Sequence, residues 1–526
     1  MATTETLLPR QIGYKSEKRY ERLSSLAVTG LLTLVAVLIH GYHPYAEDAG
    51  VYLPGVLKLL HPDLYPAWTG FVTAQSRFSL FAPTIAGLVR VSGIGVMTCI
   101  FAIYVVSIWA TLYSAWHLIA RCSKSANVCY AAVSILALCL TTPVAGTSLI
   151  LMDPYVTART ISTPCSILAL VAAIDLISSF HRTGKFPMNS VALCGGSLLI
   201  AALMHPLMAA YAAGSVLLLI CSSIADLRLR IAAVAAIALL AIATAALMNL
   251  LAPPEPAGYS TIVQTRNYWF LSAWRWYEIA GLILPLVLLA SIARIPTVLN
   301  EQARWLAQMA VSAGVIGIAI SLLFAHQWSR CYLVAMLQPL RIFQIIYFVL
   351  ILLLGAIVAD SFLKQNALRW AVTLTPLAAL MLFVQIRTFA HSSHLEFPWI
   401  SPTNDWERAF VWIRDNTPMN SIVALDANYI NSPGEDAQNA RAITEKSLPA
   451  DAAKDGGIAA IEPDLASAWF AGKNLQTDLA TITDSQRLAK LRPAHVRWLV
   501  LPSQSKTELP CPYQNNATKI CQTPDH

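Results

Sequence analysis

Apolar residues are gathered into long runs that are separated by short polar stretches. A membrane helix needs about 17–25 predominantly apolar residues to cross the hydrocarbon core. The fifth and sixth runs are short and meet at His205-Pro206, so they are either two tilted spans or one broken hairpin. The pattern therefore predicts nine to eleven transmembrane helices, at 24–42, 94–119, 128–146, 162–180, 190–204, 207–224, 231–252, 277–294, 307–325, 343–362 and 369–388.

The composition agrees with this pattern. Hydrophobic residues make up 56% of the chain and charged residues only 12%, about half the charge of an ordinary soluble domain. A soluble protein of this size could not hide so much apolar surface, whereas lipid can face it. The sequence predicts an α-helical polytopic membrane protein. The net charge of +7 follows the membrane and does not form a nucleic-acid patch.

The first 23 residues form a basic tail before the first apolar run. A signal peptide is the alternative, but the run is long and no clear small-residue cleavage site ends it. We interpret it as a retained first helix that follows a cytoplasmic tail. The basic residues of the tail are Arg10, Lys15, Lys18, Arg19 and Arg22.

Basic residues concentrate in alternate loops, which is the positive-inside pattern of membrane proteins. With the N-terminus inside, the loops 43–93, 147–161, 253–276 and 326–342 and the C-terminal region lie outside. We expect a multi-pass protein of the bacterial inner membrane whose C-terminal domain is periplasmic. The predicted cytoplasmic residues are Arg121, Lys124, Arg182, Lys185, Arg228, Arg230, Arg294, Arg304, Lys364 and Arg369.

The character of the chain changes at residue 392, which divides a transmembrane domain (24–391) from a soluble domain (392–526). Helical and strand patterns alternate beyond it, as in a small α/β domain. The predicted elements are a helix at 406–414, a strand at 421–426, a helix at 485–491 and a strand at 496–501.

Cysteine usage fits an oxidising compartment. Eight of the ten cysteines lie in or beside apolar spans, where a thiol behaves as a small hydrophobe. The remaining pair, Cys511 and Cys521, lies in a polar segment. We predict a disulfide between them; two unrelated surface thiols are the alternative.

The first external loop begins with an acidic pair, Glu47-Asp48, flanked by His43 and Tyr52. Such carboxylates can bind a divalent cation such as Mg²⁺ or Mn²⁺, or one of them can act as a general base. Adjacent residues point in different directions, so we expect one to face the site and the other to orient it. The alternative is an acidic N-cap before an interfacial helix at 51–60.

Other external segments add charges on the same side. Asp153 and Arg159 could contribute a carboxylate and a phosphate-binding guanidinium, or they could form a plain interfacial ion pair. Basic residues at outer helix ends either anchor the protein to headgroups or bind a specific phosphate. These are His205, Arg266, His326, Arg330 and Arg341.

The soluble domain contains a dense polar stretch that could contact a substrate, or could be a solvated loop. Its candidate binding residues are Asp436, Arg441 and Lys454, and Gly456-Gly457 would let the backbone approach a ligand closely. A Walker phosphate loop, HExxH, CxxC and a nucleophile elbow are absent from the sequence. These absences argue against an ATP-driven pump, a zinc protease and a serine hydrolase.

The layout resembles the GT-C superfamily of membrane glycosyltransferases, in its bacterial members. The resemblance rests on the acidic pair Glu47-Asp48 after the first helix, on Asp153 as a further external carboxylate, and on Trp412-Ile-Arg-Asp-Asn-Thr-Pro418 at the start of the soluble domain. The chain lacks the WWDYG element of oligosaccharyltransferase catalytic subunits, which disfavours peptide glycosylation.

The resemblance implies a periplasm-facing glycosyltransferase that uses a polyprenyl-phosphate-linked sugar donor. The acceptor would be an envelope glycan, lipid or protein. Asp48 would receive the acceptor proton, Glu47 or Asp153 would orient it, and Arg159, Arg266 or Arg341 would hold the phosphate. A secondary transporter or flippase, and a non-catalytic envelope-biogenesis scaffold, are the alternatives.

Overall fold

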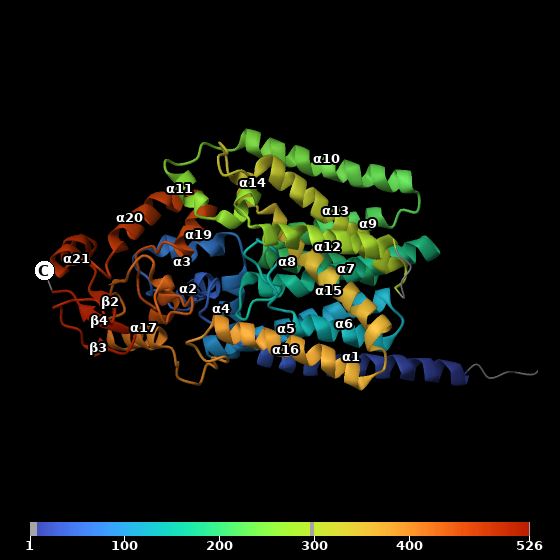
Figure 1. The fold of residues 1–526 in the computed structure, drawn as a ribbon, viewed down its shortest axis with the longest axis horizontal. Helices are drawn as coiled ribbons and strands as arrows, with labels where there is room; N and C mark the ends of the chain where they lie inside the picture. The colour runs from blue at the N-terminus through green and yellow to red at the C-terminus, as the bar shows by residue number, and fades with distance from the viewer. Residues whose placement is uncertain (1–7, 295–298, 525–526) are drawn as a thin grey trace, which may run out of the picture.

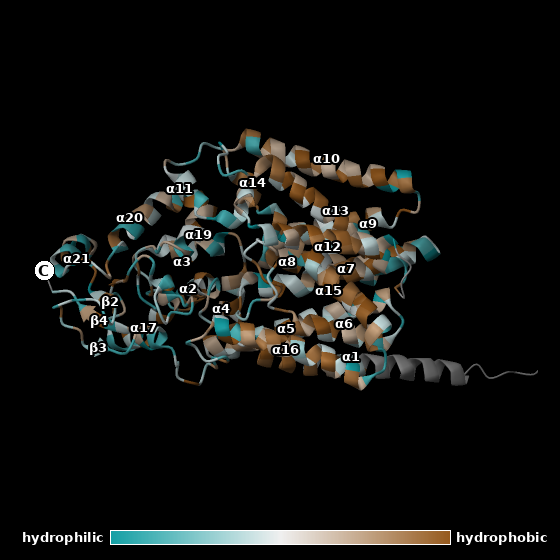
Figure 2. Cartoon of the chain, viewed as in Figure 1, coloured by the Kyte–Doolittle hydropathy of each residue, from teal (hydrophilic) through white to brown (hydrophobic). Residues whose placement is uncertain are grey.

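A computed structural model describes residues 8–294 and 299–524, with side chains from residue 23 onward. The basic side chains predicted for the tail, Arg10 to Arg22, therefore lie outside the described residues. Long apolar helices form one end of the molecule, and the C-terminal part lies against the other end (Figures 1 and 2). This arrangement confirms the predicted fold class, a helical polytopic protein with a small C-terminal α/β part.

Eight helices in the described ranges are long and apolar enough to cross a membrane. They coincide with eight of the predicted spans, and the helices at the other three are shorter. The long helices are α1 (Leu8–His40), α5 (Val96–Cys122), α7 (Ala158–Thr183), α10 (Leu227–Leu251), α12 (Trp276–Arg294), α13 (Glu301–Phe324), α15 (Phe343–Val358), which continues into η5 (Ala359–Leu363), and α16 (Ala367–Thr388).

The three shorter helices lie where the third, fifth and sixth spans were predicted. They are α6 (Ala126–Leu138), α8 (Met188–Met204) and α9 (Pro206–Ser222). Helices α8 and α9 are separate and meet at His205, so they form a helical hairpin.

The prediction for the third span was wrong at its C-terminal end, because α6 stops at Leu138 rather than residue 146. Pro143 cannot continue a helix, and the chain folds into a hairpin in which Val144 donates to the Leu149 carbonyl at 2.8 Å. The Gln344 amide of α15 donates to the Leu151 carbonyl at 2.8 Å. Non-helical backbone is tolerated at membrane depth only where it is buried or lines a cavity, and this hairpin does both.

Short helices cover the end of the bundle that faces the C-terminal part (Figure 1). The segment between α1 and α5 contributes α2 (Ala49–Leu60), α3 (Thr69–Thr73), η1 (Ala74–Arg77) and α4 (Phe81–Ser92). Later loops contribute α11 (Tyr259–Gln264), η2 (Asn267–Trp269), η3 (Leu271–Ala273), α14 (Leu333–Met336) and η4 (Pro339–Ile342).

The C-terminal part contains a four-stranded sheet in the order β1-β2-β4-β3, with β1 parallel to β2 and the other pairs antiparallel. Its strands are β1 (Val423–Ala424), β2 (Trp498–Pro502), β3 (Tyr513–Gln514) and β4 (Thr518–Gln522). Its helices are α17 (Asp405–Asn416), η6 (Tyr429–Asn431), α18 (Ala440–Thr444), α19 (Lys454–Ile461), η7 (Pro463–Leu465), α20 (Ala466–Gln476), α21 (Asp484–Leu491) and η8 (Arg492–Ala494).

Helix α17 shows how the sequence builds this part. Asn404 caps it by accepting from the Trp406 and Glu407 amides. Its apolar residues at helical spacing, Trp406, Phe410 and Ile413, pack in one core cluster with β2 and β4 residues. Strands β3 and β4 were not predicted, because their segment of the sequence is polar. The predicted Cys511–Cys521 disulfide is present, and it links β4 to the loop before β3.

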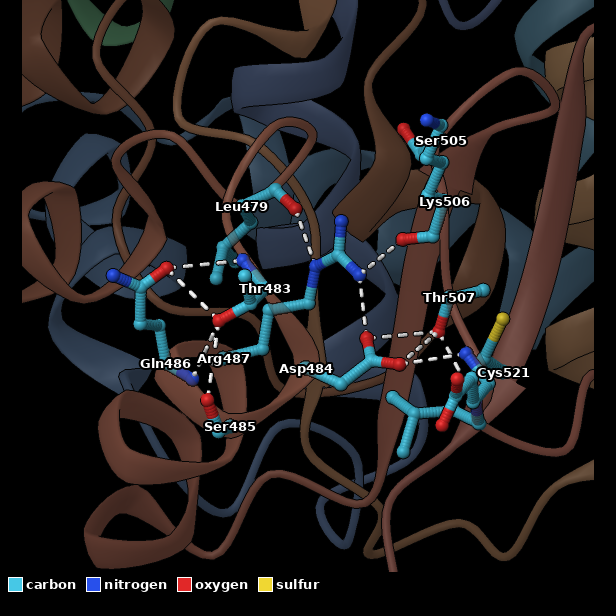
Figure 3. Close-up of polar contacts among 12 residues, drawn as sticks. Leu479, Thr483, Asp484, Ser485, Gln486, Arg487, Ser505, Lys506, Thr507 and Cys521 are labelled. Carbon is cyan, nitrogen blue, oxygen red and sulfur yellow. Dashed lines mark hydrogen bonds and ion pairs between the residues drawn. The ribbon is translucent and has the colours of Figure 1, made fainter.

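An ion pair between buried Arg487 and partly exposed Asp484 connects α21 to the loop 503–510 (Figure 3). Arg487 donates to the Leu479 carbonyl at 2.8 Å, to the Lys506 carbonyl at 2.8 Å and to Asp484 at 2.5 Å. Asp484 also accepts from Thr507 and from the Glu508 amide. Every part of this guanidinium is engaged, so the loop 503–510 is held against α21.

Candidate functional site

A cavity of about 1490 Å³ lies between the bundle and the C-terminal part. It brings together segments from both halves of the chain: α2, the hairpin after α6, the loop before α12, the residues around η4, α16 and α19. Of the residues predicted for the site, those that line it are Glu47, Asp48, Tyr52, Asp153, Arg159, His205, Arg266, Arg341 and Lys454.

Asp48 is one of the carboxylates that line the cavity. It occupies the N-cap position of α2, but its side chain makes no cap hydrogen bond. Instead its Oδ2 accepts from both terminal nitrogens of Arg159 at 3.1 Å, and 40% of its side chain remains exposed. The side chain is therefore not an N-cap, contrary to the alternative that the sequence left open.

Arg159 lies beneath this carboxylate and is 6% exposed. Besides Asp48, it donates to Asp153 at 3.0 Å, and Asp153 also accepts from the Thr157 hydroxyl at 3.4 Å. A single buried guanidinium therefore joins the acidic loop after α1 to the loop before α7. The predicted pairing of Arg159 with Asp153 is present, but Arg159 is buried rather than interfacial.

The two carboxylates differ in their proton affinity. Burial alone would raise the pKa of Asp48, but the positive charges of Arg159, Lys454 and Arg341 lower it to about 2. Burial raises the pKa of Asp153, and Arg159 only partly opposes that effect. Asp48 is thus a fixed anion that faces the cavity, and Asp153 is an inner carboxylate that holds the arginine.

Glu47 and Asp48 meet a cation from the C-terminal part. The Lys454 ammonium at the start of α19 contacts Glu47 Oε2 and lies 4.0 Å from Asp48 Oδ1. Burial would lower the pKa of Lys454, but Glu47 and Asp48 outweigh it, so the pKa is raised. The sequence had placed Lys454 among the binding residues without giving it these partners.

Arg341 differs from the other cations of the cavity. Its Nε is buried without a hydrogen-bond partner, and its side chain forms no hydrogen bond or ion pair with the residues that the structure describes. It follows Gln338, a residue with φ of +49° whose Oε1 is also buried and unpaired. This segment therefore offers unsatisfied polar groups to the cavity.

Five of the predicted binding residues lie elsewhere. His43 is buried between Glu396, at 3.3 Å, and the stacked ring of Phe389. Arg330 is exposed at the surface, as is His326. Asp436 accepts from the His391 amide at 2.8 Å, and Arg441 binds Asp455 with two bonds of 2.7 Å. Asp436 and Arg441 already have protein partners, so the structure does not bring them to the cavity.

Other lining residues were not singled out from the sequence. Arg275 and Glu278 come from the aromatic stretch at the start of α12, where Glu278 accepts from the Arg275 amide at 2.6 Å. Thr141 and Thr142 come from the part of the hairpin that was predicted to be helix, and Ile150 comes from the predicted loop that follows it. Two features of the sequence could have indicated these residues. One is the charged pair Arg275 and Glu278 within an aromatic stretch, and the other is the Thr-Thr-Pro sequence inside an apolar run.

The donor set does not fit the divalent cation considered from the sequence. Arg159 occupies the space between Asp48 and Asp153, and Lys454 neutralises Glu47. Within 8–294 and 299–524, no group of three histidine, cysteine, aspartate or glutamate residues is arranged to hold a metal ion. Guanidinium and ammonium groups take the positions that Mg²⁺ or Mn²⁺ would need, so these carboxylates are not arranged as metal ligands.

Solved structures include proteins to which this chain is similar in fold. The chain is similar to the archaeal oligosaccharyltransferase AglB from Archaeoglobus fulgidus, solved in complex with an inhibitory peptide and a dolichol-phosphate. The TM-score is 0.47 and the sequence identity 10%, over 92% of this chain and 70% of that one. No protein-family model matches the sequence, and no curated protein matches it.

Proposed function

We propose that the protein is a membrane glycosyltransferase that moves a sugar from a polyprenyl-phosphate-linked donor to an acceptor hydroxyl in this cavity. The observation that carries the proposal is the convergence of an exposed, fixed carboxylate, Asp48, with an unpaired guanidinium, Arg341, in one large cavity. A scaffold protein would not need this convergence.

Arg341 is the group that we assign to the donor phosphate. A planar guanidinium binds phosphate oxygens bidentately, and an unpaired one carries its full charge to the ligand. Arg266 also lines the cavity, but one of its nitrogens already donates to the Ala453 carbonyl at 3.0 Å. Arg159 is committed to two carboxylates, so it serves Asp48 rather than the donor.

The lipid part of the donor would lie along an apolar wall. Leu380, Met381 and Val384 of α16 and Leu207 of α9 line the same cavity. Most of α16 is unburied within the protein, and its exposed apolar side chains, such as Val372 and Phe383, would face lipid. The exposed Trp276 begins α12, and the exposed Trp328 lies in the loop after α13. Aromatic residues are enriched in such positions at a membrane interface. A polyprenyl chain could therefore reach the cavity from the bilayer.

Asp48 would orient the acceptor. Arg159 occupies Oδ2, which leaves Oδ1 to accept a hydrogen bond from the acceptor hydroxyl. The acceptor oxygen attacks the anomeric carbon, the bond from that carbon to the phosphate oxygen breaks, and the electron pair stays on the phosphate beside Arg341. The transition state is oxocarbenium-like, so the acceptor proton leaves late, and a carboxylate of low pKa can receive it.

The cellular setting is part of the same proposal. The cavity and the C-terminal domain (392–526) would face the periplasm of a bacterial inner membrane, and the acceptor would belong to the cell envelope. The supporting observation is that the first loop and the C-terminal part lie at one end of the bundle (Figure 1).

Asp48→Asn tests the reaction. We expect sugar transfer in proteoliposomes supplied with a polyprenyl-phosphate sugar to fall about 10²–10⁴-fold, the usual contribution of a positioned acid–base group. The matched control is Asp63→Asn, which alters an exposed carboxylate of the same loop. Wild-type transfer by Asp48→Asn would remove Asp48 from the mechanism.

Arg341→Gln tests the donor site. Mass spectrometry of the purified protein should find about tenfold less bound polyprenyl-phosphate lipid, because a charge-assisted hydrogen bond contributes about 1.5–3 kcal/mol. Arg330→Gln is the control, since Arg330 is an exposed arginine of the same loop region. Equal lipid content in the two variants would contradict the assignment of the phosphate to Arg341.

A further inference from the structure

The acidic loop has a backbone conformation that its own sequence does not favour. Glu47 has a φ of +50°, in the left-handed region that residues other than glycine, asparagine and aspartate seldom adopt. Such a conformation persists only when the surroundings impose it. The contacts around Glu47 therefore show what determines the position of its neighbour Asp48.

The surroundings that impose it belong to the C-terminal part. The Glu47 amide donates to the Ala437 carbonyl at 2.8 Å, and the Asn439 amide donates to the Tyr45 carbonyl at 3.0 Å. Ala46 and Gln438 form a bridge between these two bonds. The segment 437–439 is thus paired with the acidic loop as a short antiparallel ribbon.

Contact between the two segments is close enough to exclude a side chain. A Cβ atom at Gly50, in the first turn of α2, would lie 1.9 Å from Cβ of Asn439. Real Cβ atoms are never so close, so the loop and the segment 437–439 could not keep this spacing with any other residue at position 50.

Lys454 adds a charged contact to the same loop, and its own place is fixed. Its neighbour Asp455 is buried and bound by both terminal nitrogens of Arg441 at 2.7 Å. The Lys454 amide donates to Asp451 at 2.6 Å, which anchors the start of α19. The ammonium is therefore held where it reaches Glu47 and approaches Asp48 Oδ1.

We propose that Lys454 is a positioning residue and that it acts with the segment 437–439 as a clamp that sets where the Asp48 carboxylate lies in the cavity. The inference rests on the proposed transfer reaction and adds to it. The C-terminal part thereby completes the reaction site from outside the membrane bundle. Lys454 holds Glu47, and so fixes the residue next to Asp48.

Lys454→Met removes the charge and keeps much of the side-chain length. We expect the turnover number to fall about 10- to 100-fold, since a displacement of about 1 Å at a reacting group can cost 100-fold. The acid limb of the pH–rate profile should move to higher pH, because one of the cations that lower the pKa of Asp48 is gone. Lys454→Arg should restore part of the rate, and bound polyprenyl-phosphate lipid should stay at the wild-type level.

The control is Lys506→Met, which removes an exposed lysine of the C-terminal part. An unchanged rate and pH profile in Lys454→Met would overturn the positioning role. Loss of bound lipid with an unchanged pH profile would also overturn it, because Lys454 would then be a donor-binding group. If Asp48→Asn abolishes transfer and Lys454→Met does not change it, the clamp is wrong and the proposed function stands; if Asp48→Asn transfers normally, the proposed function itself fails.

A second pair of variants tests the clamp without changing charge. Gly50→Ala should lower transfer at least tenfold, because the added methyl group forces the loop away from Asn439. In the double variant Gly50→Ala/Asn439→Gly the obstructing side chain is absent, and part of the lost rate should return. A double variant no better than Gly50→Ala, with the protein folded, would contradict the clamp.

Discussion

Two arginines in this molecule bind carboxylates in opposite ways. Arg487 is 1% exposed and donates to backbone carbonyls and to Asp484, whose oxygens are in turn used by Thr507 and the Glu508 amide (Figure 3). Arg159 is also buried, yet one of its carboxylates, Asp48, faces a cavity with 40% of its side chain exposed. In the Arg487 cluster, the carboxylate of Asp484 is bonded within the protein. In the Arg159 cluster, the Oδ1 atom of Asp48 remains available to another molecule.

We interpret the Arg487 pair as stabilising the fold and the Arg159 pair as positioning a carboxylate in the cavity. A buried ion pair alone says little, because desolvation offsets most of its attraction. What distinguishes the Arg159 cluster is an inner carboxylate, Asp153, that fixes the arginine, and an outer one that the arginine presents. Three variants test this reading, in order of expected effect on sugar transfer.

Arg159→Met should have the largest effect. It leaves the buried Asp153 without its partner, which costs about 3–5 kcal/mol of stability, and it releases Asp48. Transfer should be undetectable, and thermal unfolding in detergent should occur at a lower temperature. Retained transfer would mean that Asp48 does not need its arginine.

Glu407→Gln should have an intermediate effect on sugar transfer, because it changes how the stability of the protein depends on pH. Burial first, and the nearby Glu396, raise the pKa of Glu407 far above its ordinary value of 4.5, because the hydrogen bond from Gln438 and the charge of Arg414 only partly oppose them. This carboxyl therefore stays protonated at neutral pH. Burial likewise raises the pKa of Glu435 to about 8. A raised pKa means that the folded protein binds more protons than the unfolded chain, so stability should fall as pH rises from about 4.5 to 8.

The glutamine variant mimics the protonated acid, so its unfolding temperature should decline less steeply over that range. Transfer at high pH should decline less as well, because Gln438, which donates to Glu407 at 3.1 Å, is part of the ribbon that holds the acidic loop. Identical pH profiles for the two proteins would show that Glu407 is ionised in the native state.

Arg487→Met should have the smallest effect on transfer. Its loss should destabilise the C-terminal part by about 1.5–3 kcal/mol, because Asp484 is partly exposed and can be hydrated. The rate per folded molecule should equal that of the wild type. A specific loss of transfer in the folded fraction would remove the contrast between the two arginines.

The sequence was sufficient for features that depend on local pattern. Apolar runs located the helices, and the acidic pair, Asp153 and the arginines were recognisable as charges at helix ends. It failed where an apolar run was not a helix throughout: hydropathy averaged over 128–146 concealed the end of α6 at Leu138 and the hairpin that follows it.

The partners of each charge were also beyond reach of the sequence. Arg441 and Lys454 are both basic residues in a polar stretch. Arg441 is paired with buried Asp455, whereas Lys454 contacts Glu47 in the cavity. Lys454 and Glu47 are 407 residues apart, and no spacing rule connects residues at that distance. Only the fold shows which charges are already paired.

That separation has a consequence for biosynthesis. A chain that grows at about 5–20 residues per second needs about 20–80 s to pass from Glu47 to Lys454. During that interval the helices enter the bilayer one after another, while the acidic loop has no ribbon partner. Under the proposed function, the nascent protein would be inert towards lipid-linked sugars until its C-terminal part has folded, and a truncated product left in the membrane would consume no donor.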